Sequence, residues 1–132
     1  RLQAAIAVDK YTQMCEDAVN LDIVEAVSRK GNLLYRAELE TLLPDMTELR
    51  GEAGYFYEHA ISCLDEIKNN ITEKFQTVTC FGIDPFEIRR FVITNNLRGI
   101  DRIAPVGRAM DISIIWDGFD IVRTLSRVVS VE

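Results

Sequence analysis

The sequence predicts a mixed α/β protein that contains a β-hairpin and a strand-helix-strand unit. Three observations lead to this class. Apolar residues near the start of the chain fall at helical spacing, Gly31 separates two runs rich in branched apolar residues, and Asp84-Pro85 begins a helix between two strand-like segments. Because helices and strands alternate along the chain, we expect α/β architecture.

The first fifty residues are expected to form a helix followed by a hairpin. Leu2 to Val19 carries its apolar residues on one helical face. The segments Asp22 to Lys30 and Asn32 to Leu39 have strand composition, and Gly31 between them suits a tight turn that needs a positive φ. Thr41 to Gly54 contains a proline and two glycines and is predicted to be a loop.

Three elements are expected in the middle of the chain. The aromatic run Gly54 to Glu58 has the composition of a buried strand. Cys63 to Ile71 is predicted to be a helix, with Ser62 as its N-cap. Phe75 to Ile83 alternates in the manner of a strand and leads directly into the next helix.

The strongest local signal begins at Asp84. An aspartate cap followed by Pro85 at the first helical position is a typical helix start, and Gly99 is positioned to end that helix. Ile100 to Val106 then forms a second strand. A strand, a helix and a strand of these lengths predict a βαβ unit with parallel strands and a right-handed crossover.

The last part of the chain is expected to fold around one turn. Trp116-Asp117-Gly118 is that turn, and Phe119 to Arg127 is predicted to be a helix. Val128 to Val131 is expected to form an edge strand.

Composition excludes several classes of protein. The formal charge of -6 and the pI of about 4.8 disfavour binding to a nucleic acid backbone. No apolar run is long enough for a membrane span, and no signal peptide is present, so we expect a cytoplasmic protein. The three cysteines form no Cys-x-x-Cys motif, which fits a reducing compartment. Because the chain opens at Arg1 inside a periodic segment, we expect it to be a piece of a longer polypeptide.

Cysteine and histidine are the candidate reactive residues. Cys15 is a candidate nucleophile, but it lies in a helical pattern before two carboxylates that would raise a thiol pKa, so a structural role remains the alternative. Cys63 and Cys80 are expected to be buried apolar residues. His59 beside Glu58 could act in acid-base chemistry or could simply lie at the surface. With one histidine, no metal site is predicted.

Basic residues and glycines offer a weaker signal for phosphate binding. Arg98, Arg102 and Arg108 flank the predicted βαβ unit and could contact the phosphates of a cofactor, or could be solvated surface residues. Gly99 and Gly107 do not form the Gly-x-Gly-x-x-Gly loop of dinucleotide-binding folds.

Four segments follow one another in a fixed order: Ala53-Gly54-Tyr55-Phe56-Tyr57-Glu58, Lys74-Phe75-Gln76-Thr77-Val78-Thr79 with Gly82, Gly99-Ile100-Asp101-Arg102-Ile103-Ala104-Pro105-Val106-Gly107, and Trp116-Asp117-Gly118. Together they resemble the C-terminal region of the acyl-CoA reductase family, which belongs to the aldehyde dehydrogenase superfamily and includes the fatty acid reductase of bacterial luminescence. The resemblance divides the chain into two parts. Residues 1–50 are a helix and hairpin from a larger domain, and residues 51–132 are the reductase-like segment.

The resemblance implies an aldehyde-dehydrogenase-like fold and an activity. In this family a cysteine takes the acyl group from acyl-CoA, and NADPH then reduces the thioester to a fatty aldehyde. The family's nucleophilic cysteine precedes the matched segments, in a sequence context unlike that of Cys15. NADPH would be bound mainly by an upstream part of the polypeptide, so this chain is expected to be inactive alone. The resemblance also implies that the chain forms homo-oligomers. The residues expected near substrate or cofactor are Trp116, Asp117, Gly118, Gln76, Arg102 and Gly107.

Two other function classes stay open. The chain could be an assembly or binding module that pairs Val128 to Val131 and the 22–39 hairpin with another subunit. It could also be a different α/β enzyme that uses His59 with a carboxylate.

Overall fold

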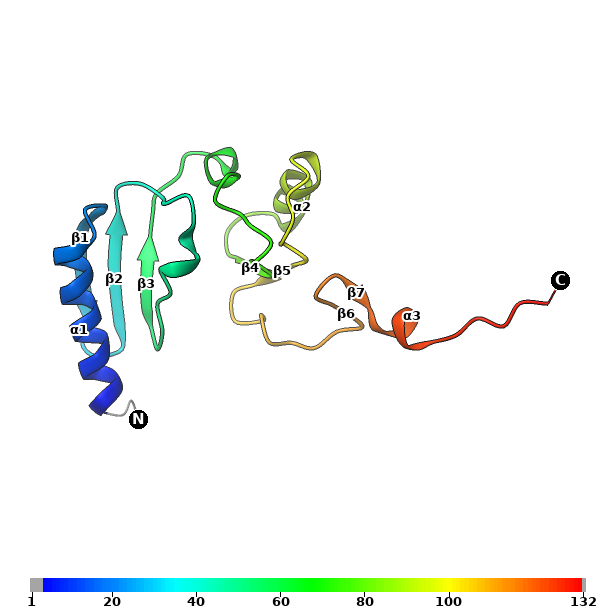
Figure 1. Cartoon of the computed structure of the whole chain (residues 1–132), viewed down its shortest axis with the longest axis horizontal. Helices are drawn as coiled ribbons and strands as arrows, with labels where there is room; N and C mark the ends of the chain where they lie inside the picture. Colours follow the sequence, from blue (N-terminus) through cyan, green and yellow to red (C-terminus); the bar gives the residue numbers. More distant parts are fainter. Residues whose placement is uncertain (1–3, 132) are drawn as a thin grey trace. The chain divides into compact units, whose positions relative to one another are not determined.

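The computed structural model describes residues 4–131, and the chain divides into two compact units (Figure 1). The first unit is Arg1–Cys63 and the second is Leu64–Glu132. The division lies after Cys63, whereas the sequence segments were divided at residue 50, because strand β3 (Tyr55–Glu58) pairs with a strand of the hairpin.

The first unit is a helix packed on a three-stranded sheet. Helix α1 (Ala4–Asn20) precedes β1 (Val24–Lys30) and β2 (Leu34–Leu39), which pair antiparallel as the predicted hairpin. Strand β3 lies parallel to β2, in the order β1-β2-β3. The predicted 41–54 loop is confirmed apart from one short 3₁₀ helix, Met46–Glu48.

One face of this sheet meets α1 and forms the core. Met14 of α1 packs with Tyr35, Ala37 and Tyr55, and half-buried Val24 and Tyr57 pack against this cluster. The ring centroids of Tyr35 and Tyr55 are 6.4 Å apart in an edge-to-face arrangement. The register that places Tyr35 opposite Tyr55 therefore brings the two largest fully buried side chains together.

Lys10 is the one charged residue that is buried in the described part of the chain, with 3% of its surface exposed. Its ammonium nitrogen donates to the backbone carbonyls of Asn32, Leu33 and Ala53 at 2.7, 3.1 and 2.9 Å. It also lies 4.6 Å from the centroid of the Tyr35 ring. All three donors are thus satisfied, and one side chain ties α1 to the hairpin turn and to the loop before β3.

The second unit contains the predicted βαβ arrangement. Strand β4 (Thr77–Cys80) is followed by helix α2 (Pro85–Thr94) and β5 (Arg102–Pro105), and the two strands pair in parallel. The Asp84 carboxylate accepts from the backbone N–H of Phe86, so the predicted cap and the Pro85 start are confirmed. A short hairpin of β6 (Ile115–Trp116) and β7 (Phe119–Asp120) precedes α3 (Ile121–Leu125).

The predicted helix over Cys63 to Ile71 is wrong. The structure has only the 3₁₀ helix η2 (Leu64–Ile67) there, with a hydrogen bond between residues three apart from the Lys68 N–H to the Asp65 carbonyl, and a further turn in which the Asn70 N–H donates to the Ile67 carbonyl. The sequence Asn69-Asn70 that follows favours turns over helix.

The predicted end of α2 at Gly99 is also wrong. Asn96 takes the left-handed conformation instead, with φ of 49°, and the N–H groups of Asn96 and Leu97 bond back to Ile93 and Val92 in a Schellman arrangement. Gly99 has a different role, because a Cβ there would lie 2.0 Å from the Thr72 carbonyl oxygen. That glycine permits two backbone segments to touch.

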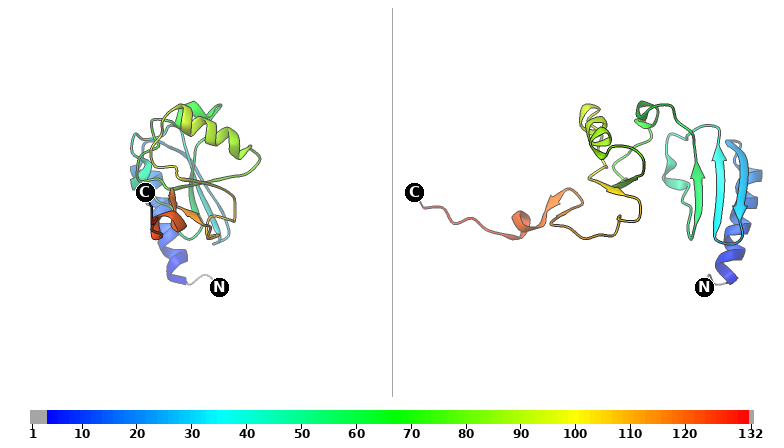
Figure 2. Two further views of the ribbon diagram at one scale, coloured as in Figure 1. Left: turned by 90° about the vertical axis from the view of Figure 1, so that its right-hand side faces the viewer. Right: turned by 180° about the vertical axis from the view of Figure 1, so that it is seen from behind.

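The C-terminal segment differs from the prediction as well. Phe119 belongs to β7, and the Asp120 side chain caps α3 by accepting from the Arg123 N–H, so the helix is shorter than the predicted Phe119 to Arg127. Val128 to Val131 is not a strand, because no described strand pairs with it (Figure 2). Across residues 4–131, no helix combines the length and apolarity needed to cross a membrane.

Replacing Lys10 by Met should strongly destabilise the first unit. The apolar chain would still fill the space, but three backbone carbonyls would lose their donor, at a total cost of about 3 kcal/mol. Urea unfolding followed by circular dichroism measures this loss. Lys30→Met, at an exposed lysine of β1, is the matched control and should change the unfolding free energy by less than about 0.5 kcal/mol. Equal effects of the two substitutions would contradict the role of Lys10.

Candidate functional site

Several of the residues singled out by the resemblance converge in the second unit. Gln76 directly precedes β4, Arg102 begins β5, and Trp116 ends β6. The backbone N–H groups of Asp101 and Arg102 both donate to the Gln76 carbonyl, at 3.0 and 3.1 Å. The strand pairing therefore places the Gln76 backbone beside the start of β5.

The Arg102 side chain connects this point to the rest of the site. Its guanidinium carbon lies 4.9 Å from the centroid of the Trp116 ring, within cation–π range. Its terminal nitrogens donate to the backbone carbonyls of Arg108, Ala109 and Asp111. Arg102 therefore contacts both the indole and the loop that follows β5.

The turn between β6 and β7 is tight. Asp117 and Gly118 have φ of 48° and 78°, as in the turns that favour Asp-Gly in two-residue hairpins. A Cβ at Gly118 would lie 3.0 Å from the Asp101 carboxylate oxygen, so Asp101 packs against the turn backbone. Only glycine combines this conformation with this contact.

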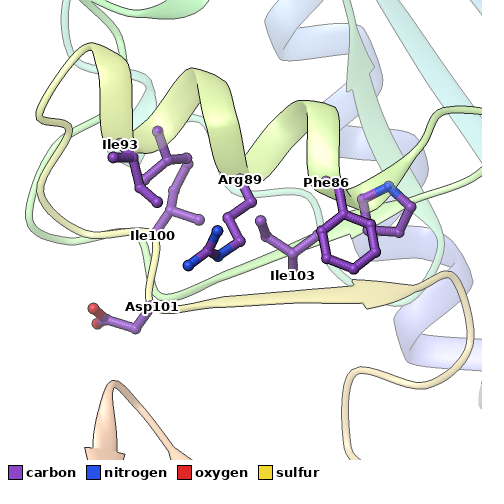
Figure 3. Close-up of a pocket in the computed structure, with 8 residues that line it drawn as sticks. Phe86, Arg89, Ile93, Ile100, Asp101 and Ile103 are labelled. Atoms are coloured by element: carbon purple, nitrogen blue, oxygen red, sulfur yellow. The ribbon is translucent and has the colours of Figure 1, made fainter.

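A groove lies between α2 and β5 (Figure 3). It has a volume of about 390 Å³, and its lining is largely apolar: Pro85, Phe86, Val92, Ile93, Ile100 and Ile103, with Arg89 and Asp101. Figure 3 shows the Arg89 side chain reaching from α2 toward the strand, with Asp101 at one end of the groove. Because Asp101 also packs against Gly118, the groove ends next to the Trp116-Asp117-Gly118 turn.

Gly107 lies farther along the chain, in the loop after β5. Its φ is 86°, and a Cβ there would meet nothing within 4 Å, so the backbone conformation and not a close contact favours glycine at this position. The next residue closes this turn, because the Arg108 N–H donates to the Pro105 carbonyl.

The three arginines considered for phosphate binding, Arg98, Arg102 and Arg108, contact other groups of the protein in this structure. Arg98 pairs with Glu73 at 3.3 Å, and Arg108 pairs with Asp111. Arg98 and Arg108 are well exposed. Arg102, by contrast, uses its terminal nitrogens on carbonyl oxygens.

Cys15 lies in the first unit, exposed on α1. Two residues on, the Asp17 carboxylate accepts hydrogen bonds from the hydroxyls of Tyr55 and Tyr57 at 2.6 and 2.7 Å, and Gln13 donates to the Tyr57 hydroxyl. None of these contacts brings a cationic side chain next to Cys15. The thiol thus lacks the arrangement that usually activates a nucleophile.

The other two cysteines differ in their exposure. Cys80 is buried in β4, as expected. The expectation that Cys63 is buried is wrong, because Cys63 is exposed where the predicted helix fails to form.

His59 and Glu58 have separate partners. His59 Nδ1 lies 2.8 Å from the Leu39 carbonyl oxygen, which fits donation by an Nδ1–H. Glu58 is bound by the Arg36 guanidinium, with Nε at 2.7 Å, and this hydrogen bond lowers the pKa of the Glu58 carboxyl. A carboxylate held ionised by arginine is a poor proton acceptor for acid-base work at neutral pH.

No group of three or more histidine, cysteine, aspartate and glutamate side chains within residues 4–131 is arranged to hold a metal ion. No known protein family, curated protein or solved structure matches the chain.

Two contributors to the site were not singled out in the sequence. The Asp101 side chain contacts the Gly118 backbone, and Asp101 directly precedes Arg102 in a segment that the resemblance covers. The groove residues Phe86 and Ile93 lie seven positions apart on α2, so helical periodicity was the available signal.

The tyrosine pair on Asp17 should make the first unit sensitive to alkaline pH. Burial, followed by the hydrogen bond to Asp17, raises the pKa of Tyr57 to about 12 and raises that of Tyr55 further. Because the folded pKa exceeds the unfolded value of about 10, the stabilisation is fully present below pH 10 and is lost as the pH rises through 12.

Urea unfolding between pH 8 and 12 tests this expectation. The free energy of unfolding should fall above pH 10, and Tyr57→Phe should reduce the slope. Tyr11→Phe, at an exposed tyrosine of α1, is the control and should leave the slope as in the wild type. An identical slope in the Tyr57 variant would rule out this contribution.

Proposed function

We propose that this chain is the C-terminal portion of an NADPH-dependent acyl-CoA reductase with an aldehyde-dehydrogenase-like fold, and that it acts in the cytoplasm. The observation that carries the proposal is the convergence of three segments that resemble this family. Gln76, Arg102 and Trp116 come from separate parts of the chain and lie around one point in the second unit.

The size and lining of the groove beside this point favour an apolar substrate. Its volume of about 390 Å³ falls in the range of small-molecule pockets, and its lining is apolar. The fatty chain of an acyl-CoA has matching chemistry, and Asp101 marks the end nearest the Trp116 turn. We assign the Trp116-Asp117-Gly118 turn to the substrate entrance on this basis.

The described residues do not fit the dinucleotide itself. The chain has no glycine-rich phosphate loop, and the arginines of the second unit that were candidates for phosphate binding contact carboxylates or carbonyls. NADPH would supply the hydride, and the residues that hold it belong to an upstream part of the polypeptide. Under this proposal, no residue of this chain takes part in the step that uses NADPH.

The reacting thiolate also belongs upstream in this proposal. An enzyme of this class needs a cysteine that attacks the acyl carbonyl and releases CoA as its thiol. Cys15 is exposed on α1 in the first unit, whereas Gln76, Arg102 and Trp116 belong to the second. The chain alone should therefore show no turnover.

Oxidation of NADPH by the longer polypeptide, supplied with acyl-CoA of several chain lengths, tests the proposal. Turnover should survive Cys15→Ala, and the 132-residue chain should have none. Trp116→Ala should raise the KM for long-chain acyl-CoA by about tenfold, since loss of a buried aromatic contact costs about 1.4 kcal/mol or more. Absence of turnover in the longer polypeptide would overturn the function, and an unchanged KM would remove the turn from the entrance.

A second candidate function, self-association, is favoured by a specific observation. The segment after α3 is extended, and its apolar residues are almost fully exposed: Val128 94%, Val129 89% and Val131 95% (Figure 2). Leu125 at the end of α3 is 81% exposed. Apolar residues gathered in this way are typical of surfaces that associate, and a second copy of the chain would form the homo-oligomer.

Replacing Val128 and Val129 together by Asp should lower the apparent mass of the protein in multi-angle light scattering. Charge on the exposed segment opposes burial against another subunit. Val19→Asp, at a valine of α1 that is 80% exposed, is the matched control and should leave the mass unchanged. A wild-type chain that is monomeric at all concentrations would refute self-association.

A further inference from the structure

The contacts of Arg102 differ from those of a ligand-binding arginine. Arginines that bind phosphate or carboxylate present their planar fork to the anion. The terminal nitrogens of Arg102 instead point at three backbone carbonyls, those of Arg108, Ala109 and Asp111. The guanidinium carbon lies over the Trp116 ring, 4.9 Å from its centroid.

These contacts join β5 to the two segments that follow it, the 108–111 loop and the β6–β7 hairpin. The backbone of Arg102 is held in β5 by the Gln76 carbonyl, which fixes where its side chain starts. The side chain then reaches the 108–111 loop and the β6–β7 hairpin. Because β6 and β7 are only two residues long each, the hairpin has few hydrogen bonds of its own to define its position.

We propose that Arg102 is a positioning residue, which holds the Trp116 indole and the adjoining turn at the substrate entrance and does not itself bind phosphate. The functional part of this inference rests on the proposed reductase activity. The loop carbonyls orient the guanidinium, and the guanidinium orients the indole. Lysine would keep the charge, but its single ammonium nitrogen would have to replace two terminal guanidinium nitrogens that reach different carbonyls, so it would hold the loop and the indole in a different geometry.

The position of the indole can be measured in this chain, because Trp116 is its only tryptophan. Arg102→Gln should shift the emission maximum to longer wavelength and increase acrylamide quenching about twofold, since the half-buried ring loses the guanidinium beside it. Arg102→Lys should give an intermediate result. Arg98→Gln removes another exposed arginine of the second unit, one that pairs with Glu73 and does not contact the 108–111 loop in the described hydrogen bonds, and should behave as the wild type.

Circular dichroism of each variant separates this effect from unfolding. If Arg102→Gln unfolds the second unit, Arg102→Lys carries the comparison, because its side chain keeps the apolar stem and the charge. Emission and quenching that match the wild type in a folded Arg102 variant would overturn the inference. An equal change in Arg98→Gln would also overturn it.

The catalytic consequence is measured in the longer polypeptide. Arg102→Lys should raise the KM for acyl-CoA about tenfold and change kcat much less, because a misplaced entrance weakens substrate positioning. Equal losses in NADPH and acyl-CoA affinity would favour phosphate binding by Arg102 and overturn the proposal. If the longer polypeptide has no turnover, the reductase function and the entrance role both fail, and fluorescence still decides whether Arg102 holds the indole.

Discussion

The placement of the loops in each unit depends on one long cationic side chain that donates hydrogen bonds to loop carbonyls. In the first unit, Lys10 reaches Asn32, Leu33 and Ala53, and it lies against the Tyr35 ring. In the second, Arg102 reaches three carbonyls of the 108–111 loop and lies against the Trp116 ring. Backbone carbonyls in irregular segments have no strand partner, so a side-chain donor must supply their hydrogen bonds when they are removed from water.

The two cations differ in burial, and their consequences differ accordingly. Lys10 is 3% exposed, so removing its donors leaves carbonyls without water and costs stability. Arg102 is half-buried, and water can replace part of what it donates. Its loss should therefore change the position of a turn more than the stability of the unit. Units of this size bury modest cores, which makes single polar contacts of this kind influential.

Periodicity and turn chemistry predicted α1, the 24–39 hairpin and the parallel β4-α2-β5 unit, because those signals are local. They failed at Gly99, where a nearby asparagine ended the helix and the glycine instead allowed contact with Thr72. Burial of Lys10 could not be predicted, since its partners are backbone carbonyls that leave no mark in the sequence. The same holds at the candidate site: motif order predicted that Gln76, Arg102 and Trp116 matter, but not that Arg102 would contact carbonyls.

The turn at Gly118 is held from two directions by consecutive residues. Successive side chains on an extended strand point to opposite sides, so Asp101 packs beneath the Gly118 backbone while Arg102 covers the Trp116 ring. Asp101 also lines the groove between α2 and β5. The start of β5 therefore contributes one residue to both the groove and the turn, Asp101, and the next residue contacts the indole.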